Sequence, residues 1–282
     1  MRTLIFGAKG QLGRDLSAVF RDCSEVAGHD LPELDIADVA AVRAAVDAFT
    51  PGIVINAAAY TDVDGAEDAL EVAFRVNETG ARNVAEAAAQ IGAPVVFYST
   101  DYVFNGAKRT PYLPEDPPAP LGVYARSKAA GEAATRAANP KHFIIRTAWL
   151  YGPGGNNFVE KMLRVAAARP ELKVVAEEIG SPTHTLDLAK ATLALVRTQA
   201  YGVYHAVNAG SCSRFEFAKR IVALAGLTTP VTPCTAAEFP TKAPRPVYSV
   251  LSSEKLERVS GYRLRPWEEA LEHYIRRRSL HP

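Results

Sequence analysis

Residues 1–13 read MRTLIFGAKGQLG, an apolar run that passes directly into three glycines. Residues 3–7 are typical of a buried strand, and a helical pattern begins at Gln11. Gly7, Gly10 and Gly13 between them have the spacing GxxGxxG. Glycines allow a tight turn and let backbone N–H groups approach an anion, which the positive end of a helix dipole also attracts. The segment therefore predicts a strand–turn–helix unit that binds a dinucleotide pyrophosphate; a glycine-rich turn without a ligand is the alternative.

Further apolar runs alternate with helical patterns through residue 150. The runs cover residues 25–30, 52–60, 94–100 and 142–152, and helices are expected from Val39 and over Glu78–Gln90. Unbroken apolar runs separated by helices indicate parallel strands that are buried on both faces. The fold class is therefore predicted as α/β, a doubly wound, Rossmann-like parallel sheet formed by residues 1–150.

The pattern changes after Tyr151. Helices are expected over Phe158–Ala168, Leu186–Thr198 and Pro266–Arg278, and strands over Leu172–Val175 and Gly202–Asn208. Five prolines between residues 230 and 246 predict an irregular wrapping segment. Residues 151–282 are thus expected to form a smaller, mainly substrate-binding part, with some segments returning to the first domain.

The composition narrows the class of protein. Of 282 residues, 48% are apolar and 22% are charged, which argues against disorder, and the net charge of +1 gives no case for a nucleic-acid or membrane partner. Cys23, Cys212 and Cys234 show no metal-ligand spacing, and no apolar run approaches the ~20 residues that span a bilayer. The N-terminus carries no signal-peptide pattern. We expect a soluble protein of the reducing cytoplasm.

Two acidic segments follow the expected second strand. Asp30 comes 17 residues after Gly13, where a carboxylate can accept hydrogen bonds from adenosine ribose hydroxyls and repel a 2′-phosphate. The alternative is an aspartate that only begins a turn. Asp35 and Ile36 are candidates to lie beside the adenine, whereas Asp38 suits the N-cap of the next helix.

A catalytic pair is predicted near residue 124. Tyr124 and Lys128 have the spacing YxxxK ahead of an alanine-rich helical segment, so they share one helix face. A nearby ammonium is expected to lower the pKa of the phenol and make its proton transferable. Ser99, Thr100 and Asp101 end an apolar strand, and ligands of open α/β sheets bind at that edge. A surface Tyr/Lys pair is the alternative interpretation.

Together these features resemble the extended short-chain dehydrogenase/reductases. The resemblance is carried by GxxGxxG, residues 56–61 (NAAAYT), residues 99–104 (STDYVF) and YxxxK. Residues 146–152 (RTAWLYG), residues 180–183 (GSPT) and residues 245–251 extend it in the same order to about residue 275. The finer features are similar to those of members that reduce the 4-keto group of dTDP-linked 6-deoxyhexoses.

The resemblance implies roles for individual residues. Thr100, Tyr124 and Lys128 would be catalytic, and Thr100, Asp101 and Trp149 would contact the sugar substrate. The cofactor-binding residues it implies, taken with the three glycines and Asp30, are Gly7, Gly10, Gln11, Leu12, Gly13, Asp30, Asp35, Ile36, Ala59, Tyr60, Thr61, Tyr98, Tyr124 and Lys128.

One family feature is not matched. Some members bind Mg²⁺ between subunits through carboxylates on the first helix and after the Gly-x-Pro-Thr segment. Here the first position is Asp15, and Thr183–Leu186 offers no second carboxylate. Since a magnesium site needs several oxygen ligands, we expect no metal, and a homodimer is left open.

The resemblance implies reduction of dTDP-4-dehydro-L-rhamnose to dTDP-L-rhamnose by NADH or NADPH, with NADH favoured by Asp30. A nucleotide-sugar epimerase or dehydratase of the same fold is one alternative. A dehydratase would need a further acid/base pair, and only Asp101 follows Thr100 directly. A catalytically idle regulatory subunit is the other alternative.

Overall fold

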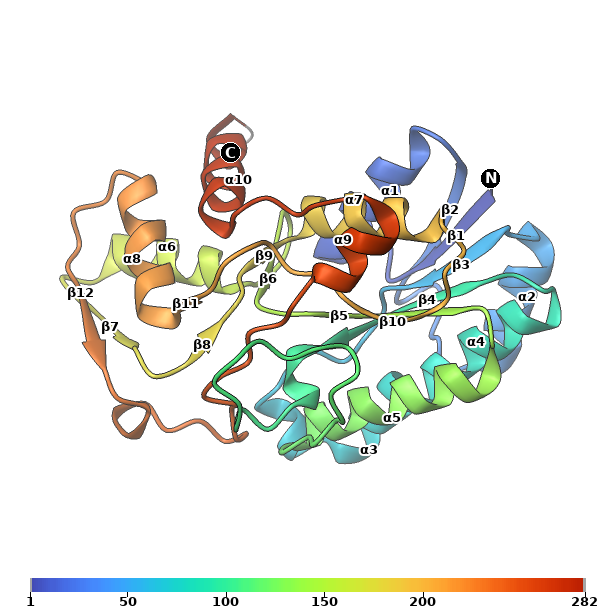
Figure 1. Ribbon diagram of the computed structural model, residues 1–282, viewed down its shortest axis with the longest axis horizontal. Coiled ribbons are helices and arrows are strands. Elements are labelled where there is room, and N and C mark those ends of the chain that lie inside the picture. The colour runs from blue at the N-terminus through green and yellow to red at the C-terminus, as the bar shows by residue number, and fades with distance from the viewer. Residues whose placement is uncertain (1, 281–282) are drawn as a thin grey trace.

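A six-stranded parallel sheet lies at the centre of the computed structural model, which describes residues 2–280 (Figure 1). The chain leaves β1 toward β2 on one side and later toward β3 on the other, so the strand order has a switch point between β1 and β3. This arrangement confirms the predicted doubly wound, Rossmann-like fold. In spatial order the strands are β10 (Gly202–His205), β5 (His142–Thr147), β4 (Val95–Thr100), β3 (Ile53–Asn56), β1 (Arg2–Phe6) and β2 (Glu25–His29).

Helices cover both faces of the sheet (Figure 1). Helices α1 (Gln11–Arg21) and α7 (Thr185–Val196) pack together on one face, beside the short α9 (Glu254–Ser260). The other face carries α2 (Val39–Phe49), α4 (Ala81–Gln90) and α5 (Val123–Ala138). All residues of β3 and β4 are buried, as unbroken apolar runs predict for strands covered on both faces.

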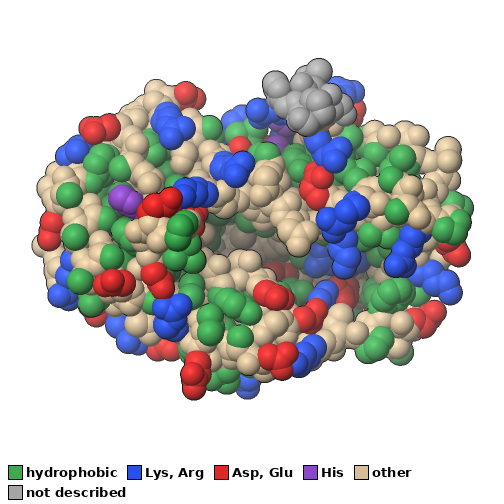
Figure 2. Space-filling view, turned by 180° about the vertical axis from the view of Figure 1, so that it is seen from behind, with side chains coloured by type: hydrophobic (Ala, Val, Ile, Leu, Met, Phe, Trp, Pro, Cys, Tyr) green, Lys and Arg blue, Asp and Glu red, His purple; other side chains and the backbone are tan. Residues whose placement is uncertain are grey.

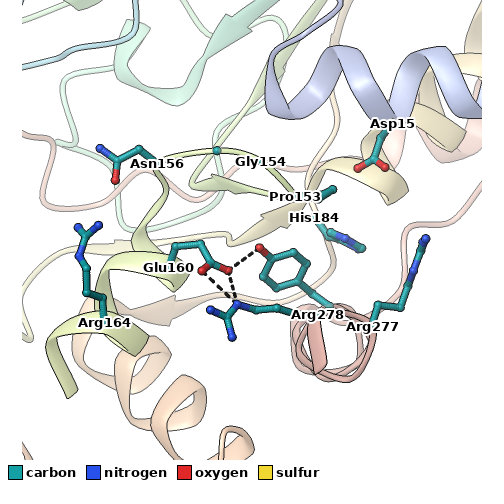
Figure 3. Close-up of a pocket in the computed structure, with 11 residues that line it drawn as sticks. Asp15, Pro153, Gly154, Asn156, Glu160, Arg164, His184, Arg277 and Arg278 are labelled. Atoms are coloured by element: carbon teal, nitrogen blue, oxygen red, sulfur yellow. Dashed lines mark hydrogen bonds and ion pairs between the residues drawn. The ribbon is translucent and has the colours of Figure 1, made fainter. Parts of the chain in front are cut away.

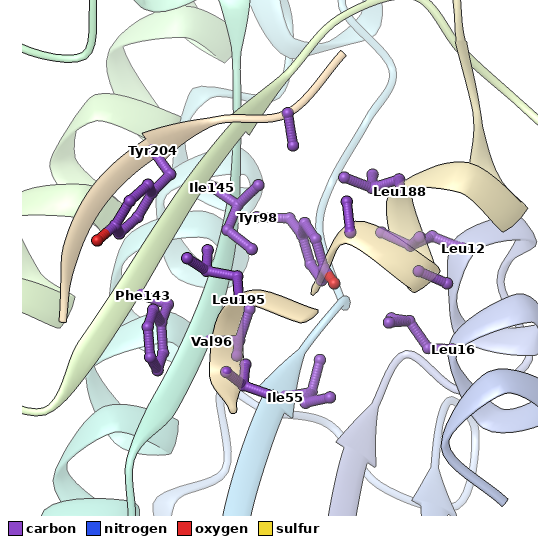
Figure 4. Packing of buried hydrophobic residues seen from close by; sticks show 14 of the residues in the cluster. Leu12, Leu16, Ile55, Val96, Tyr98, Phe143, Ile145, Leu188, Leu195 and Tyr204 are labelled. Carbon is purple, nitrogen blue, oxygen red and sulfur yellow. The ribbon is translucent and has the colours of Figure 1, made fainter. Parts of the chain in front are cut away.

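The larger hydrophobic core joins the sheet to α1 and α7 (Figure 4). Leu12 and Leu16 of α1, Leu188 and Leu195 of α7 and Val96 of β4 all belong to this core. Full burial of each such side chain contributes roughly 1.5–3 kcal/mol, so this layer holds the glycine-rich turn firmly against the sheet.

The smaller part has its own aromatic core. Tyr151, Phe217 and Trp267 lie at its centre, between α6 (Phe158–Ala168), α8 (Arg214–Leu224) and α10 (Trp267–Leu280). Three two-stranded sheets complete it: β6 (Leu150–Tyr151) with β9 (Thr183–His184), β7 (Leu172–Val175) with β12 (Val231–Cys234), and β8 (Ile179–Gly180) with β11 (Cys212–Ser213). Helix α7 and strand β10 lie beyond residue 150 and yet pack with the central sheet. The division of the chain into two domains at residue 150 stays a prediction.

Some predicted boundaries were wrong. The apolar run 142–152 is not one strand: β5 ends at Thr147, and Trp149 adopts φ 45° before β6 begins. The run 52–60 contains only the four-residue β3, because Ala57–Tyr60 leave the sheet at its binding edge. Helices α8 and α9 were missed, as were the short elements η1 (Gly65–Glu67), α3 (Leu70–Phe74), η2 (Arg75–Gly80), η3 (Asp101–Val103) and η4 (Ala236–Glu238). Among residues 2–280, no helix has the length and apolar character to cross a membrane.

Candidate active site

The carboxyl ends of β1, β3 and β4 lie at one edge of the sheet, beside the switch point. The glycine-rich turn follows β1, residues 57–61 follow β3, and Thr100 ends β4. Seen from behind, the molecule is hollowed where the sheet-bearing part meets the smaller part, with basic and acidic side chains around the hollow (Figure 2). The predicted cofactor and catalytic segments therefore converge at the edge where open α/β sheets bind ligands.

The glycine-rich turn leaves no room for side chains. Gly7 has φ +79°, and a Cβ there would lie 2.5 Å from Ala58 N, while a Cβ on Gly13 would lie 2.0 Å from Gly7 O. Gly10 is the N-cap of α1 and supplies no side-chain cap, so the first N–H groups of the helix remain available to an anion. Gln11 and Leu12 open this helix; the Leu12 side chain is buried in the core. The cradle fits a dinucleotide pyrophosphate.

Asp30 is fixed beside this turn, directly after β2. Its Oδ2 accepts a hydrogen bond of 2.8 Å from Lys9 N, and its Oδ1 accepts one of 2.8 Å from Leu31 N. Two oxygens with further lone pairs thus remain oriented at the turn. The Lys9 ammonium pairs instead with Glu33 at 2.6 Å, so it faces Glu33 rather than the turn.

Asp35 and Ile36 follow on the same side of the sheet. Asp35 accepts a hydrogen bond from Ala37 N at 2.9 Å, which lowers the pKa of the carboxyl, and it pairs with Arg75 at 2.7 Å. Ile36 is buried, and a Cβ on Gly80 would lie 2.6 Å from its side chain. The nearby Asp38 caps α2 through Ala40 N and Ala41 N, as predicted.

The catalytic candidates come together where β4 meets α5. Thr100 is the last residue of β4, and Tyr124 and Lys128 lie one turn apart at the start of α5. The Thr100 hydroxyl lies near enough to the Tyr124 phenol to act on its pKa. Lys128 is only 3% exposed, and its Nζ lies 4.2 Å from the centroid of the Phe97 ring. Two hydroxyl donors and a buried ammonium thus share one end of the helix.

The expected lowering of the Tyr124 pKa by Lys128 was wrong for this structure. Burial raises the pKa of the Tyr124 phenol above its ordinary value, and the nearby Thr100 hydroxyl offsets only part of that effect. Burial also lowers the pKa of Lys128 to about 7. Neither group is among the causes of the other's shift, and the low polarity around both decides the two directions. The phenol carries its proton throughout the neutral range, as a proton donor must.

A hydrogen-bond network that sequence reasoning missed ties the catalytic helix to the loop after β3. Asn77 accepts from Tyr60 N at 2.9 Å and donates to Tyr60 O at 3.0 Å and to Ser127 Oγ at 2.9 Å. Ser127 Oγ in turn donates to Tyr124 O at 2.8 Å. Residues 59–61 and Tyr124 are thus positioned by one buried amide, which lies in the π-helical turn η2.

Asp101 is the most unusual carboxyl group of the site. It is 2% exposed, and Thr100 Oγ1 donates to its Oδ1 at 3.0 Å. Its Oδ2 has no hydrogen-bond partner among residues 2–280. Burial raises the pKa of Asp101 to about 6, although the neighbouring Ser249 and Thr100 hydroxyls act in the opposite direction. Such an unpartnered buried oxygen is suited to a ligand hydroxyl.

Trp149 is held between two parts of the smaller domain. The guanidinium Cζ of Arg214 lies 3.6 Å from the centroid of the indole, and a Cβ on Gly180 would lie 2.5 Å from indole Cε2. Arg214 also pairs with Glu178 at 3.5 Å, and its charge acts on Asp101. No local pattern could have identified Arg214, because its partner lies 65 residues earlier in the chain.

The Tyr98 side chain is directed away from this edge. It packs in the core shared with α1 and α7 (Figure 4). Its hydroxyl lies 2.7 Å from Thr192 Oγ1. A cofactor contact by Tyr98 would therefore involve atoms other than a free hydroxyl. Its role, like the other cofactor and substrate roles, stays a prediction.

Asp15 borders a cavity of about 600 Å³ (Figure 3). One carboxylate oxygen accepts a hydrogen bond of 2.5 Å from Thr185, and burial raises the pKa of Asp15. Across the cavity, Glu160 accepts from Tyr274 at 2.7 Å and pairs with Arg278 at 2.9 Å (Figure 3). Over residues 2–280, no three His, Cys, Asp or Glu side chains are grouped to hold a metal ion.

Comparisons with known proteins cover nearly the whole chain. Residues 1–279 match the RmlD substrate binding domain family. The spore coat polysaccharide biosynthesis protein SpsK of Bacillus subtilis is 43% identical, over 99% of this chain and 98% of its own length. The dTDP-4-dehydrorhamnose reductase of Mycobacterium tuberculosis is 44% identical, over 96% of this chain and 91% of its own.

A solved structure is equally similar. The dTDP-4-dehydrorhamnose reductase of Bacillus anthracis, in complex with NADP, superimposes with a TM-score of 0.95. The identity is 42%, and the match covers 98% of this chain and 99% of the other. The resemblance inferred from the motifs therefore extends over the full length of both sequence and fold.

Proposed function

This chain belongs to the RmlD substrate binding domain family, and we propose that it reduces dTDP-4-dehydro-L-rhamnose to dTDP-L-rhamnose with a reduced nicotinamide dinucleotide. The observation that carries the proposal is the juxtaposition of the Thr100 and Tyr124 hydroxyls at the carboxyl end of β4, with Lys128 one turn along α5. This set suits the reduction of a carbonyl group, because it combines a proton donor, a hydrogen-bond donor and a cation.

Four features of the site have distinct roles in the proposed reduction. Tyr124 donates its proton to the carbonyl oxygen at C4 of the sugar. The Thr100 hydroxyl, which donates to Asp101 Oδ1 in the free protein, turns to donate its hydrogen bond to the same oxygen as negative charge develops there, which stabilises the transition state. When bound, the nicotinamide cofactor supplies the hydride to C4. Lys128 holds the nicotinamide ribose, and the glycine cradle holds the pyrophosphate.

Asp101 and Trp149 are assigned to the sugar. The unpartnered Oδ2 of Asp101 can accept a hydrogen bond from a sugar hydroxyl, and the indole of Trp149 offers an apolar face to the ring. Arg214 stacks on that indole, so it fixes the orientation of Trp149. Its guanidinium makes it a candidate to approach the diphosphate of the substrate.

The direct test follows the absorbance of the reduced cofactor with and without dTDP-4-dehydro-L-rhamnose. Stoichiometric oxidation that depends on the keto sugar supports the proposal. An epimerase or dehydratase would convert a nucleotide sugar without net oxidation of added cofactor, and an idle regulatory subunit would show no turnover. Either of these results would contradict the proposed reaction.

NADH is the proposed preferred cofactor, with measurable use of NADPH. Asp30 carries its charge beside the turn, and its Oδ2 is held by Lys9 N, so a 2′-phosphate would meet a fixed carboxylate. At physiological salt the repulsion is screened over about 8 Å, which keeps the preference moderate. The ratio of kcat/KM for NADH and NADPH should shift toward NADPH in Asp30→Ala. A parent enzyme that prefers NADPH, with an unchanged ratio in the variant, would show that Asp30 does not face the ribose.

The proposed compartment is the cytoplasm, which suits the unpaired Cys23, Cys212 and Cys234. The sequence leaves open whether the protein forms a homodimer. Analytical ultracentrifugation at the concentrations used in the assays measures its oligomeric state.

A further inference from the structure

Three ionised side chains that the mechanism only partly uses lie in a row behind the active site. Lys128 and Glu132 stand one turn apart on α5, and Arg146 lies on the neighbouring β5. Their exposed fractions are 3%, 2% and 1%. Burying charged side chains this deeply costs free energy unless opposite charges lie close together. The interactions among these three side chains therefore need to be identified.

Glu132 is held rigidly by Arg146. Arg146 Nε donates to Glu132 Oε1 at 2.9 Å, and the terminal NH2 group of Arg146 donates to Oε2 at 2.7 Å. Arg146 is fixed in turn by a 3.2 Å hydrogen bond to Pro114 O and by the Phe104 ring, 5.1 Å from its Cζ. This bidentate geometry keeps the carboxylate in one place, on the same helix face as Lys128.

The Lys128 ammonium, by contrast, has no hydrogen bond or ion pair with any residue between 2 and 280, and it lies 4.2 Å from the centroid of the Phe97 ring. Burial lowers the pKa of Lys128 to about 7, and the charge of Glu132 works against that effect. A buried amine in this position loses its proton more readily than an exposed lysine does. Its charge therefore depends on whatever negative group stays close by.

Other charged or titratable groups surround the helix. Tyr124 lies on α5 itself, Asp101 and Tyr102 follow β4, and Glu67 of η1 accepts from Val123 N at 2.8 Å. Glu78, Arg82 and Glu86 lie on the outer side, beside alanines of α5. His205, next to Arg146, is neutral because burial lowers its pKa to about 3. Among all of these, Glu132 alone acts appreciably on the charge of Lys128.

We propose that Glu132, clamped by Arg146, is a positioning residue that favours the charged form of the Lys128 amine near neutral pH and so helps it to hold the nicotinamide ribose. The cofactor role of Lys128 rests on the proposed function; the charge relation between Glu132 and Lys128 does not. Loss of the carboxylate should lower the Lys128 midpoint by at least one pH unit. Above neutral pH, that shift reduces the charged fraction of Lys128 about tenfold.

The test separates this role from a purely structural pairing. Glu132→Gln alone leaves Arg146 buried without a partner, so the main variant is the double change Glu132→Gln with Arg146→Met, which removes both charges. Glu132→Asp and Glu132→Asn form a second pair, matched in length and different in charge. Circular dichroism and thermal melts establish which variants fold.

The first readout is the titration of Lys128 in protein carrying isotope-labelled lysine, followed by NMR, with the signal assigned by its absence in Lys128→Arg. We expect a parent midpoint near neutrality, retention of that midpoint in Glu132→Asp, and a fall of at least one unit in the double variant and in Glu132→Asn. Equal midpoints in a folded variant without the carboxylate and in the parent would overturn the proposal. This readout needs neither cofactor nor substrate, so it stands apart from any failure of the proposed reaction.

The second readout is the pH dependence of NADH affinity, measured by fluorescence. In the double variant, NADH affinity should decline at a lower pH than in the parent, and the KM for the cofactor should rise more than kcat falls. A Glu132 that served only to neutralise Arg146 would leave the affinity profile of the double variant unmoved, and that result would also overturn the proposal.

Discussion

Replacing Asp101 with asparagine should make the protein more stable at alkaline pH and less active. Burial holds the pKa of Asp101 at about 6, against an ordinary value of 3.8, so the folded state resists its ionisation. Two units of difference correspond to about 3 kcal/mol. The folded protein carries this penalty only when the carboxyl is charged.

The sign follows from the direction of the shift. Because the pKa is raised on folding, the associated stability is fully present below about pH 4 and is lost as the pH rises through about 6. The amide that replaces the carboxyl in Asp101→Asn is neutral at every pH. The difference in free energy of unfolding between Asp101→Asn and the parent should therefore be about 2–3 kcal/mol larger at about pH 8 than at about pH 4.

Urea unfolding at the two pH values measures this double difference. Packing or hydrogen-bonding changes caused by the amide are the same at both pH values and cancel. Asp47→Asn, at an exposed position on α2, is the control and should change by less than about 0.5 kcal/mol at either pH. If the difference in free energy of unfolding between Asp101→Asn and the parent changes by less than about 1 kcal/mol between the two pH values, burial does not raise the pKa of Asp101 as described. Turnover should fall in the same variant, because a carboxylate that is retained although it destabilises the fold is expected to bind the substrate.

Three further changes test the geometry around the site. Gly7→Ala puts a Cβ 2.5 Å from Ala58 N at φ +79°, so NADH affinity should fall at least about tenfold and the Tm should drop; a titration matching the parent would contradict the tight turn. Gly180→Ala puts a Cβ 2.5 Å from the Trp149 indole, so the KM for the sugar should rise while NADH affinity stays the same, and an unchanged KM would argue against Trp149 as a sugar contact. Glu67→Ala removes the acceptor for Val123 N at the start of α5, which should cost about 1 kcal/mol in urea unfolding and lower kcat; equal stability would show that the cap is dispensable.

The sheet and its binding edge were predictable because their signals are local. Unbroken apolar runs indicated β3 and β4, and the glycine spacing at residue 7 indicated the turn, since steric exclusion at Gly7 and Gly13 leaves few other residues possible. The helix face shared by Tyr124 and Lys128 follows from their four-residue spacing alone.

What could not be predicted depends on contacts between distant segments. Asn77 lies just before the helix expected over Glu78–Gln90 and belongs to no motif, yet it joins Tyr60 to Ser127. The break at Trp149 is stabilised by Arg214 and by the space left at Gly180, neither of which is near it in sequence.

The pKa of Tyr124 was misjudged for the same reason. Spacing shows that Lys128 is near, but only the packed structure shows how little water surrounds both groups. Burial, rather than the charge of the neighbour, decides the direction of both shifts.

The central claim is that Tyr124 donates the proton in the reduction of a 4-keto sugar, and Tyr124→Phe tests it most directly. The change removes the hydroxyl and keeps the ring that packs against Tyr102 at a centroid distance of 6.0 Å. Steady-state kinetics with dTDP-4-dehydro-L-rhamnose at saturating NADH should show kcat reduced by roughly 10²–10⁴, with NADH affinity nearly unchanged by fluorescence titration. A kcat within about tenfold of the parent would contradict the assignment of Tyr124 as the general acid.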